Sequence, residues 1–191
     1  MFFQSSKQRY RFLLKLFLIK VLFGIKERMR VEASQCQPFC NVPSPWIEQG
    51  KNICYGALNS AYGKFVLSQD CQLYAIRLRH VSGSLSCDKY LGPNYFSKWG
   101  CHRNSKSIRT VVADPKSNKL WFPDITIDED RDEYEIDGFG SEDDLLVMKK
   151  RGNFTKGDEL QIWYTEDWIQ SIHAYNNAGL HCVDVDISCL I

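Results

Sequence analysis

The stretch Cys182-Val-Asp-Val-Asp-Ile-Ser-Cys189 decides the fold class of this chain. Apolar Val183, Val185 and Ile187 alternate with polar residues, a period of two that is typical of a strand with one face in a core and one in water. Seven residues of extended chain separate the two cysteines by roughly 23 Å, whereas a disulfide tolerates less than about 7 Å between Cα atoms. Both cysteines must therefore bond to partners elsewhere and hold the last strand at its two ends.

The same alternation recurs earlier in the chain. Residues 74–79 and 160–165 alternate in the same way, and shorter apolar runs occupy 61–67, 108–112 and 120–122. Turn-forming Gly, Pro, Asn and Asp residues separate these runs. Short strands with frequent turns predict an all-β fold, a single domain built as an antiparallel β-sandwich or jelly roll.

The N-terminal segment, residues 1–33, has the composition of a signal peptide. It holds eight basic and two acidic residues, and its apolar run from Phe12 to Ile25 is interrupted by two lysines. A membrane span needs roughly 20 apolar residues, so we expect no stable span here. Val-Glu-Ala33 fits a cleavage site, and we expect 34–191 to be one secreted β domain. The alternative is a basic amphipathic helix at a membrane surface or on a partner.

Removal of this segment changes the charge of the protein. The whole chain has 24 basic and 23 acidic residues, whereas 34–191 has 16 basic and 21 acidic residues, a net charge of −5. Nucleic-acid binding needs a concentrated basic surface, so this acidic product is not expected to bind nucleic acid.

An even set of cysteines follows the export signal, as in secreted domains held together by disulfides. The eight cysteines are Cys36, Cys40, Cys54, Cys71, Cys87, Cys101, Cys182 and Cys189. Eight cysteines allow 105 pairings, so the connectivity stays open. We expect one of the last two to bond to Cys36 or Cys40, and Cys87 to bond to Cys101.

A structural zinc site is the alternative use of these cysteines, and we do not expect one. Zinc sites favour closely spaced cysteine pairs, and Cys36-x₃-Cys40 is the only close pair in the sequence. His102 is adjacent to Cys101 and His181 to Cys182, and neighbouring residues of a strand point to opposite faces.

Residues 124–144 form an acidic segment with eleven carboxylates and one base, Arg131. The start of this segment resembles an EF-hand loop, but Glu133 replaces the turn glycine and Phe139 the last glutamate, so a high-affinity EF-hand is not expected. Clustered carboxylates still suit weak binding of calcium or of a mineral surface, and beyond such calcium no cofactor is expected. The candidate ligands are Asp128, Asp130, Asp132, Glu133, Glu135 and Asp137. The alternative is a solvated acidic loop.

Aromatic residues crowd the stretch 163–168. We expect Trp163 or Tyr164 in the core, and Trp168, in a loop beside two acids, at a glycan-binding surface. Asn153-Phe-Thr is a sequon that would place a glycan on a loop of a secreted protein. The chain has no G-x-S-x-G, H-E-x-x-H or phosphate-loop motif, so we expect no enzymatic activity.

Several segments resemble a family of small secreted cysteine-rich proteins of corals and sea anemones. The matching stretches are 54–57 (CYGA), 76–83 (IRLRHVSG), 95–101 (YFSKWGC), 159–164 (ELQIWY) and 179–185 (GLHCVDV). Some members belong to the organic matrix of stony-coral skeletons and have no assigned activity. The resemblance therefore implies a location and carries over no functional residue. This chain departs from the family pattern at Thr165 and in its acidic segment.

Two functional hypotheses follow. The first is a non-enzymatic extracellular-matrix protein, a component of a calcified skeleton, whose acidic segment meets calcium, a mineral surface or other matrix components. The second is a lectin-like module that binds glycans through Trp168 and neighbouring polar loops.

Overall fold

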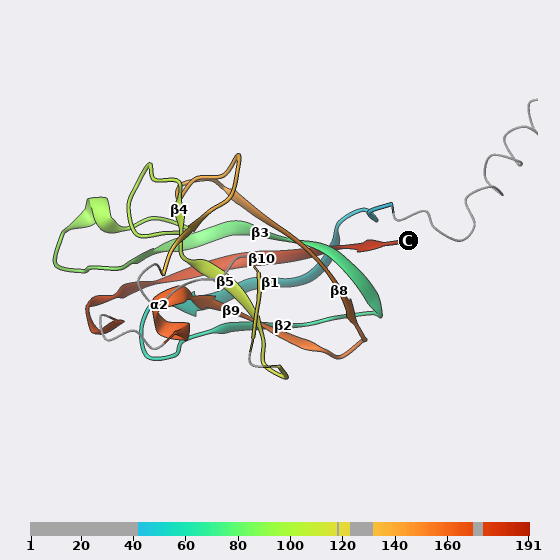
Figure 1. Ribbon diagram of the computed structural model, residues 1–191. Helices are drawn as coiled ribbons and strands as arrows, with labels where there is room; N and C mark the ends of the chain where they lie inside the picture. The colour runs from blue at the N-terminus through green and yellow to red at the C-terminus, as the bar shows by residue number, and fades with distance from the viewer. Residues whose placement is uncertain (1–41, 118, 123–131, 170–173) are drawn as a thin grey trace, which may run out of the picture. The chain divides into compact units, whose positions relative to one another are not determined.

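The chain folds back on itself so that its first strand pairs with its last. The computed structural model describes residues 42–117, 119–122, 132–169 and 174–191 (Figure 1). Its strands are β1 (Ile47–Gly56), β2 (Gly63–Val66), β3 (Cys71–Ser86), β4 (Ser107–Ile108), β5 (Thr110–Asp114), β6 (Lys119–Phe122), β7 (Tyr134–Glu135), β8 (Leu145–Phe154), β9 (Glu159–Tyr164) and β10 (Ala178–Leu190). A short helix, α2 (Thr165–Trp168), follows β9, and 3₁₀ turns cover Pro93–Tyr95 and Ala174–Asn176. The expected signal peptide, 1–33, lies outside the described residues.

The strand pairs are nested one inside the next. β1 pairs with β10, β2 with β9, β3 with β8, β4 with β7 and β5 with β6, all antiparallel. Further pairing of β3 with β10 and of β5 with β9 closes two four-stranded sheets, β1-β10-β3-β8 and β2-β9-β5-β6, which Figure 1 shows as two layers. This is one long hairpin rolled into a jelly roll. The all-β antiparallel sandwich predicted from the alternation is confirmed.

The core lies between the two sheets and follows the alternation in the sequence. Val183, Val185 and Ile187 of β10 are fully buried, and they meet Leu160 and Ile162 from β9 across the sandwich. Full burial of an aliphatic side chain stabilises the fold by roughly 1.5–3 kcal/mol. The inward face of the last strand is therefore a main source of stability.

The aspartates of β10 predicted that the outward face of this strand would lie in water, and the structure differs. Asp186 is only 4% exposed, because Arg77 and Arg79 on β3 both bond to its carboxylate at 2.8–3.0 Å. The two guanidiniums supply the partners that a buried carboxylate needs. The alternation therefore located the strand correctly, but the outer residue is a member of a buried ion-pair network.

The two sheets come into close contact where β6 meets β8. A side chain at Gly152 of β8 would place its Cβ atom 1.9 Å from the Trp121 ring of β6. The Trp121 ring also packs edge-on against Phe154, with 4.8 Å between the ring centroids. A side chain at position 152 would overlap the indole, so glycine is what lets Trp121 pack against β8.

Candidate functional site

The last strand is held at both ends by disulfides, as predicted. Cys182 bonds to Cys54, its neighbour on β1, and Cys189 bonds to Cys71 at the start of β3. Each of these bonds joins neighbouring strands of one sheet. The disulfides therefore fix the pairing of β10 with the strands on both of its sides.

The expectation that Cys182 or Cys189 bonds to Cys36 or Cys40 is wrong. Both late cysteines already have partners inside the sheet, because the nested strand order brings β1 and β3 against β10. Cys36 and Cys40 themselves lie outside the described residues, so their pairing stays open.

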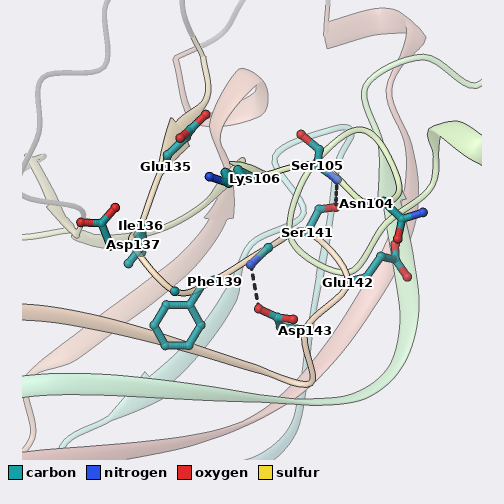
Figure 2. Close-up of a pocket in the computed structure, with 12 residues that line it drawn as sticks. Asn104, Ser105, Lys106, Glu135, Ile136, Asp137, Phe139, Ser141, Glu142 and Asp143 are labelled. Carbon is teal, nitrogen blue, oxygen red and sulfur yellow. Dashed lines mark hydrogen bonds between the residues drawn. The ribbon is translucent and has the colours of Figure 1, made fainter.

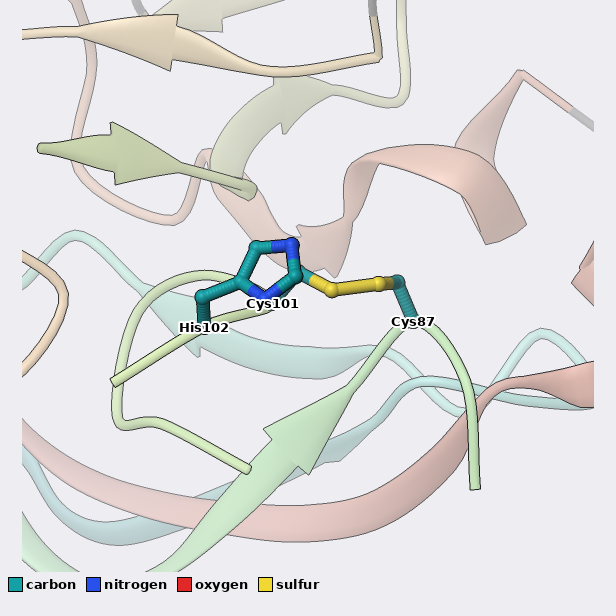
Figure 3. A group of neighbouring side chains, drawn as sticks. All are labelled: Cys87, Cys101 and His102. Atoms are coloured by element: carbon teal, nitrogen blue, oxygen red, sulfur yellow. A yellow bond between two sulfur atoms is a disulfide. The ribbon is translucent and has the colours of Figure 1, made fainter. Parts of the chain in front are cut away.

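The predicted bond between Cys87 and Cys101 is present, and it bears on the metal alternative. A ring nitrogen of His102 lies within 4.8 Å of both sulfurs, so the three side chains form a compact group (Figure 3). Metals bind thiolates, and both sulfurs of this group are committed to the disulfide. The group is therefore a covalent staple with a histidine beside it, and it offers a metal at most one imidazole.

The acidic segment is divided between different surroundings. Asp128 and Asp130 lie outside the described residues. Asp132 and Glu133 turn toward a buried arginine, and Glu135 and Asp137 line a pocket with later residues of the segment. The six predicted calcium ligands are therefore not one uniform solvated run.

Arg109 holds the beginning of the described acidic segment. Its guanidinium lies 2.8 Å from Asp132 Oδ2 and 3.4 Å from Glu133 Oε2, and it also bonds to the buried carboxylate of Glu166. Burial raises the pKa of the Glu133 carboxyl. A hydrogen bond from Ser107 and the Arg109 guanidinium lower this pKa by more than burial raises it, so that it lies below its usual value. Glu133 is therefore ionised at neutral pH, and the three ion pairs of Arg109 tie the acidic segment to β5 and α2.

A pocket of about 600 Å³ lies between two segments that are distant in sequence, 104–106 and 135–143. Figure 2 shows Glu135 and Asp137 on one side of this pocket, and Asn104 and Glu142 on the other. Phe139 lies at the bottom of the same view. The pocket therefore combines carboxylates and an amide with one aromatic ring.

Hydrogen bonds join the two segments that line the pocket, 104–106 and 135–143. Ser141 N donates to Ser105 O at 2.7 Å, and Ser105 N donates to Ser141 Oγ at 3.1 Å. Within the segment 135–143, Gly140 N donates to Asp143 Oδ2 at 2.7 Å (Figure 2). Two hydrogen bonds therefore join the two segments, and the third, to Asp143, stabilises the second segment internally.

The segment 141–144, which we call the pocket wall, is supported from the core. The fully buried Trp99 donates from Nε1 to Asp143 O at 2.6 Å and from its backbone N to Ser141 O at 3.1 Å. Lys98 Nζ donates to Glu142 O at 2.7 Å and pairs with the Asp144 carboxylate at 2.7 Å. The position of the wall therefore depends on how Trp99 packs.

Such a lining suits a polyhydroxylated ligand. Carboxylate and amide side chains accept and donate hydrogen bonds in planar pairs, and an aromatic ring packs against the apolar C–H face of a sugar. The sequence had indicated the carboxylates, as part of the acidic segment. It gave no sign of Asn104–Lys106 or of Phe139, because these residues join the site only through the fold.

The aromatic cluster at 163–168 is arranged differently from the expectation for Trp168. Tyr164 is fully buried, which confirms one core aromatic, and Trp163 is half-buried with its ring stacked on the exposed Tyr62 at 4.6 Å. Trp168 ends helix α2 instead of lying in a loop, and the neighbouring Glu166 is only 4% exposed. The acids beside Trp168 are thus buried groups of the fold, not a polar sugar-binding loop.

Asn153 also differs from its expected place. It lies in β8, an edge strand, instead of a loop, and its side chain is exposed next to the turn that leads to β9. The exposed side chain leaves the predicted glycosylation sterically accessible, and that modification stays a prediction.

The comparisons with known proteins bear on function. No protein-family model matches the chain, and no curated protein is similar to it. Among solved structures, AJLec from the sea anemone Anthopleura japonica has the same fold, with a TM-score of 0.66 and 25% sequence identity over 75% of this chain and 96% of AJLec. This chain is similar to a sea anemone lectin. AJLec thereby supports the cnidarian part of the resemblance found in the sequence, and nothing in the comparison with AJLec supports a skeletal matrix.

The similarity to AJLec and the three disulfides of the described residues are consistent with a secreted protein. AJLec, as a lectin, is a non-enzymatic protein. Among the described residues, the structure contains no helix of the length and apolar character that a membrane crossing requires.

Proposed function

We propose that this protein is a secreted lectin-like carbohydrate-binding protein, and that the pocket between 104–106 and 135–143 is its sugar site. The observation that carries the proposal is the fold shared with AJLec, together with a pocket whose lining offers planar polar groups beside an aromatic ring. This proposal favours the second of the two hypotheses drawn from the sequence, but at a different site from Trp168.

The chemistry of the pocket narrows the ligand class. Glu135, Asp137, Glu142 and Asp143 face one lysine, Lys106, so the lining has a net negative charge. An anionic sugar would be repelled from such a lining, whereas the hydroxyls of a neutral sugar donate hydrogen bonds to carboxylates. The expected ligand is therefore a neutral glycan.

A glycan array probed with the purified protein tests this proposal. The paired substitutions Glu135→Gln and Asp137→Asn keep the size of both side chains and remove their charges. Each hydrogen bond to a charged group contributes about 1.5–3 kcal/mol, so the pair should weaken binding at least tenfold. Glu48→Gln on β1, an exposed acid outside the pocket, is the matched control and should bind as the parent does. Parent protein that binds no glycan, or a double variant that binds as well as the parent, would contradict the proposal.

Calcium binding by the acidic segment stays a prediction, with one observation in its favour. Within the described part of the chain, the Arg109 guanidinium contacts the carboxylates of Asp132, Glu133 and Glu166, and this group of four side chains carries an excess of negative charge. Divalent cations relieve such an excess. A thermal melt in millimolar calcium should shift upward if the segment binds calcium, and Asp132→Asn should reduce the shift. An unchanged melting temperature would rule this binding out.

The mineral-surface role rests on the acidic composition of 124–144, and the location in a calcified matrix rests on the sequence resemblance. Retention on calcite, compared between the full chain and a variant in which 124–144 carries amides in place of carboxylates, would test them. Equal retention would show that the segment has no such role.

A further inference from the structure

A line of hydrogen bonds runs from a partly exposed histidine into the core. His80 Nδ1 on β3 lies 2.8 Å from His181 Nε2 on β10, and His181 Nδ1 lies 3.0 Å from the Tyr55 hydroxyl on β1. The Tyr55 hydroxyl lies 2.7 Å from Thr110 Oγ1 on β5, which donates to the backbone carbonyl of Trp99 at 3.3 Å. Four buried or half-buried side chains thus connect both sheets to Trp99.

The last acceptor fixes the direction of the whole line. A carbonyl can only accept, so the single hydroxyl proton of Thr110 points to Trp99 O, and Thr110 must accept from Tyr55. Tyr55 in turn accepts from His181 Nδ1–H. A neutral His181 then has only a lone pair at Nε2, which accepts from His80 Nδ1–H. The free site for a new proton is therefore His80 Nε2, at the outer end of the line.

This arrangement has no room for a proton on His181 Nε2. If His181 were protonated at Nε2, two N–H groups would face each other across the 2.8 Å contact between the histidine rings. His181 is fully buried, and burial together with the charges of His80 and Lys98 lowers its pKa to about 3. Burial and Lys98 also lower the pKa of His80, although Asp144 and Glu142 oppose this change. The folded arrangement thus disfavours protonation of both rings.

The histidine pair touches the supports of the pocket wall. The Trp99 ring stands edge-on to His181 with 4.7 Å between centroids, and the same indole donates to Asp143 O. His80 N donates to Asp144 O at 2.9 Å. The pocket wall, 141–144, is therefore held from behind by the residue that packs on His181 and by the backbone of His80.

We propose that the His80–His181 pair is an acid-sensitive support of the pocket wall, which releases the wall when the medium becomes acidic. Its consequence for ligand affinity rests on the proposed function, whereas the release itself does not. Opening of the wall would expose both rings to water, where each takes up a proton near its ordinary pKa of about 6.5. Because the open form binds more protons than the closed form, the open form gains population as the pH falls below about 6.5.

Hydrogen–deuterium exchange of the full chain, measured between pH 7 and pH 4.5 and corrected for the intrinsic exchange rate, tests the release. We expect protection of the amides of 141–144 to fall at least tenfold more than that of Ile162 and Val112. These two residues lie in the sheet β2-β9-β5-β6, away from the strands that carry His80 and His181. An equal loss of protection in the wall and in that sheet would overturn the proposal, because it would indicate global unfolding.

Three variants separate the pair from other titrating groups. His80→Gln keeps a donor toward His181 but cannot titrate, and it should reduce the acid-induced loss of protection in the wall. His181→Asn should remove most of that loss. His102→Gln changes an exposed histidine outside the pair and should leave the loss as in the parent. Parent-like pH profiles in both His80→Gln and His181→Asn would overturn the proposal.

Two further readouts keep the test decisive. If His181→Asn does not fold, the ring protons of His181 in the parent are followed by NMR, and a titration midpoint near 6.5 would overturn the proposal. On a glycan array, parent protein should bind more weakly at pH 5 than at pH 7.5, and His80→Gln should lose less. If the array shows no binding at any pH while the exchange difference persists, the proposed function fails and the acid-sensitive support stands.

Discussion

Replacing Arg109 by methionine tests whether the start of the described acidic segment depends on one buried charge. The Arg109 side chain is 12% exposed and contacts Asp132, Glu133 and Glu166, of which Glu166 is the most deeply buried with 5% of its side chain exposed. Methionine fills a similar volume without charge, so the variant isolates the electrostatic part of the contact.

The expected loss follows from the burial of the three carboxylates. Removal of one member of a buried ion pair costs about 3–5 kcal/mol, because the remaining charge is left without a partner. Glu166 accounts for most of this cost. Glu133 contributes little, since 44% of its side chain is exposed and solvent screens it. We expect Arg109→Met to lower the free energy of unfolding at pH 7 by about 3 kcal/mol.

The pH dependence of this loss distinguishes it from a packing defect. In the parent, the Ser107 hydrogen bond and Arg109 hold the pKa of Glu133 below its usual value despite burial, so this carboxyl stabilises the fold above its unfolded pKa and the stabilisation is lost as the pH falls through its folded pKa. Without Arg109 the carboxylates take up protons at higher pH. The difference between parent and variant should therefore shrink between pH 7 and pH 4, and Glu133 supplies only a small part of this change because its carboxylate is screened by solvent.

Urea denaturation followed by tryptophan fluorescence measures these free energies at both pH values. Arg151→Met, a substitution at an exposed position of β8, is the control and should change stability by less than about 0.5 kcal/mol. A loss below about 1 kcal/mol for Arg109→Met at pH 7, or a loss that stays constant down to pH 4, would refute the electrostatic account.

Three further predictions concern the scaffold. Gly152→Ala should destabilise the fold by about 1–3 kcal/mol in thermal or urea melts, because the new methyl group would overlap the Trp121 ring, and Trp121→Leu in the same chain should recover part of the loss. Serine at both Cys54 and Cys182, which are 128 residues apart, should lower the free energy of unfolding by about 4–5 kcal/mol, and a loss below about 1 kcal/mol would argue against the chain-entropy estimate. Asn153→Gln should remove one N-glycan from protein secreted by eukaryotic cells, which mass spectrometry detects, and an unchanged mass would show that the sequon is not used.

The sequence predicted the strands well, because alternation is a local property. The alternating run at 160–165 corresponds to β9, and the run at 183–187 lies inside β10. The apolar run at 61–67 contains β2, and the run at 120–122 lies inside β6. In the two alternating runs the period of two decides which residues face inward, whereas the shorter apolar runs indicate only where a strand lies.

The parts that local pattern could not predict depend on partners far along the chain. Asp186 is buried only because Arg77 and Arg79 arrive from β3, more than 100 residues earlier. Glu166 is buried because Arg109 lies beside it, 57 residues earlier. Charged residues without a visible partner are expected in water, so the sequence placed these acids at the surface.

The pocket was beyond prediction for the same reason. Its carboxylates stood out as a charge run, but 104–106 carry no unusual composition and reach 139–143 only through the hydrogen bonds between Ser105 and Ser141. The pairing of the late cysteines was missed because alternation identifies a strand without naming its neighbours.

The nested order of the strands has a consequence for folding during synthesis. β1 is made first, yet its partner β10 is the last of the described strands to be synthesised, so the outermost ladder cannot form before β10 has been made. The innermost pair, β5 with β6, is joined by a short turn and needs no distant partner. Local pairs close early and distant ones late, so the ladder should assemble from its centre outward. Cys54 and Cys71 must then wait as free thiols for Cys182 and Cys189, which are synthesised 128 and 118 residues later, and a cell that makes this protein has to protect them until that point.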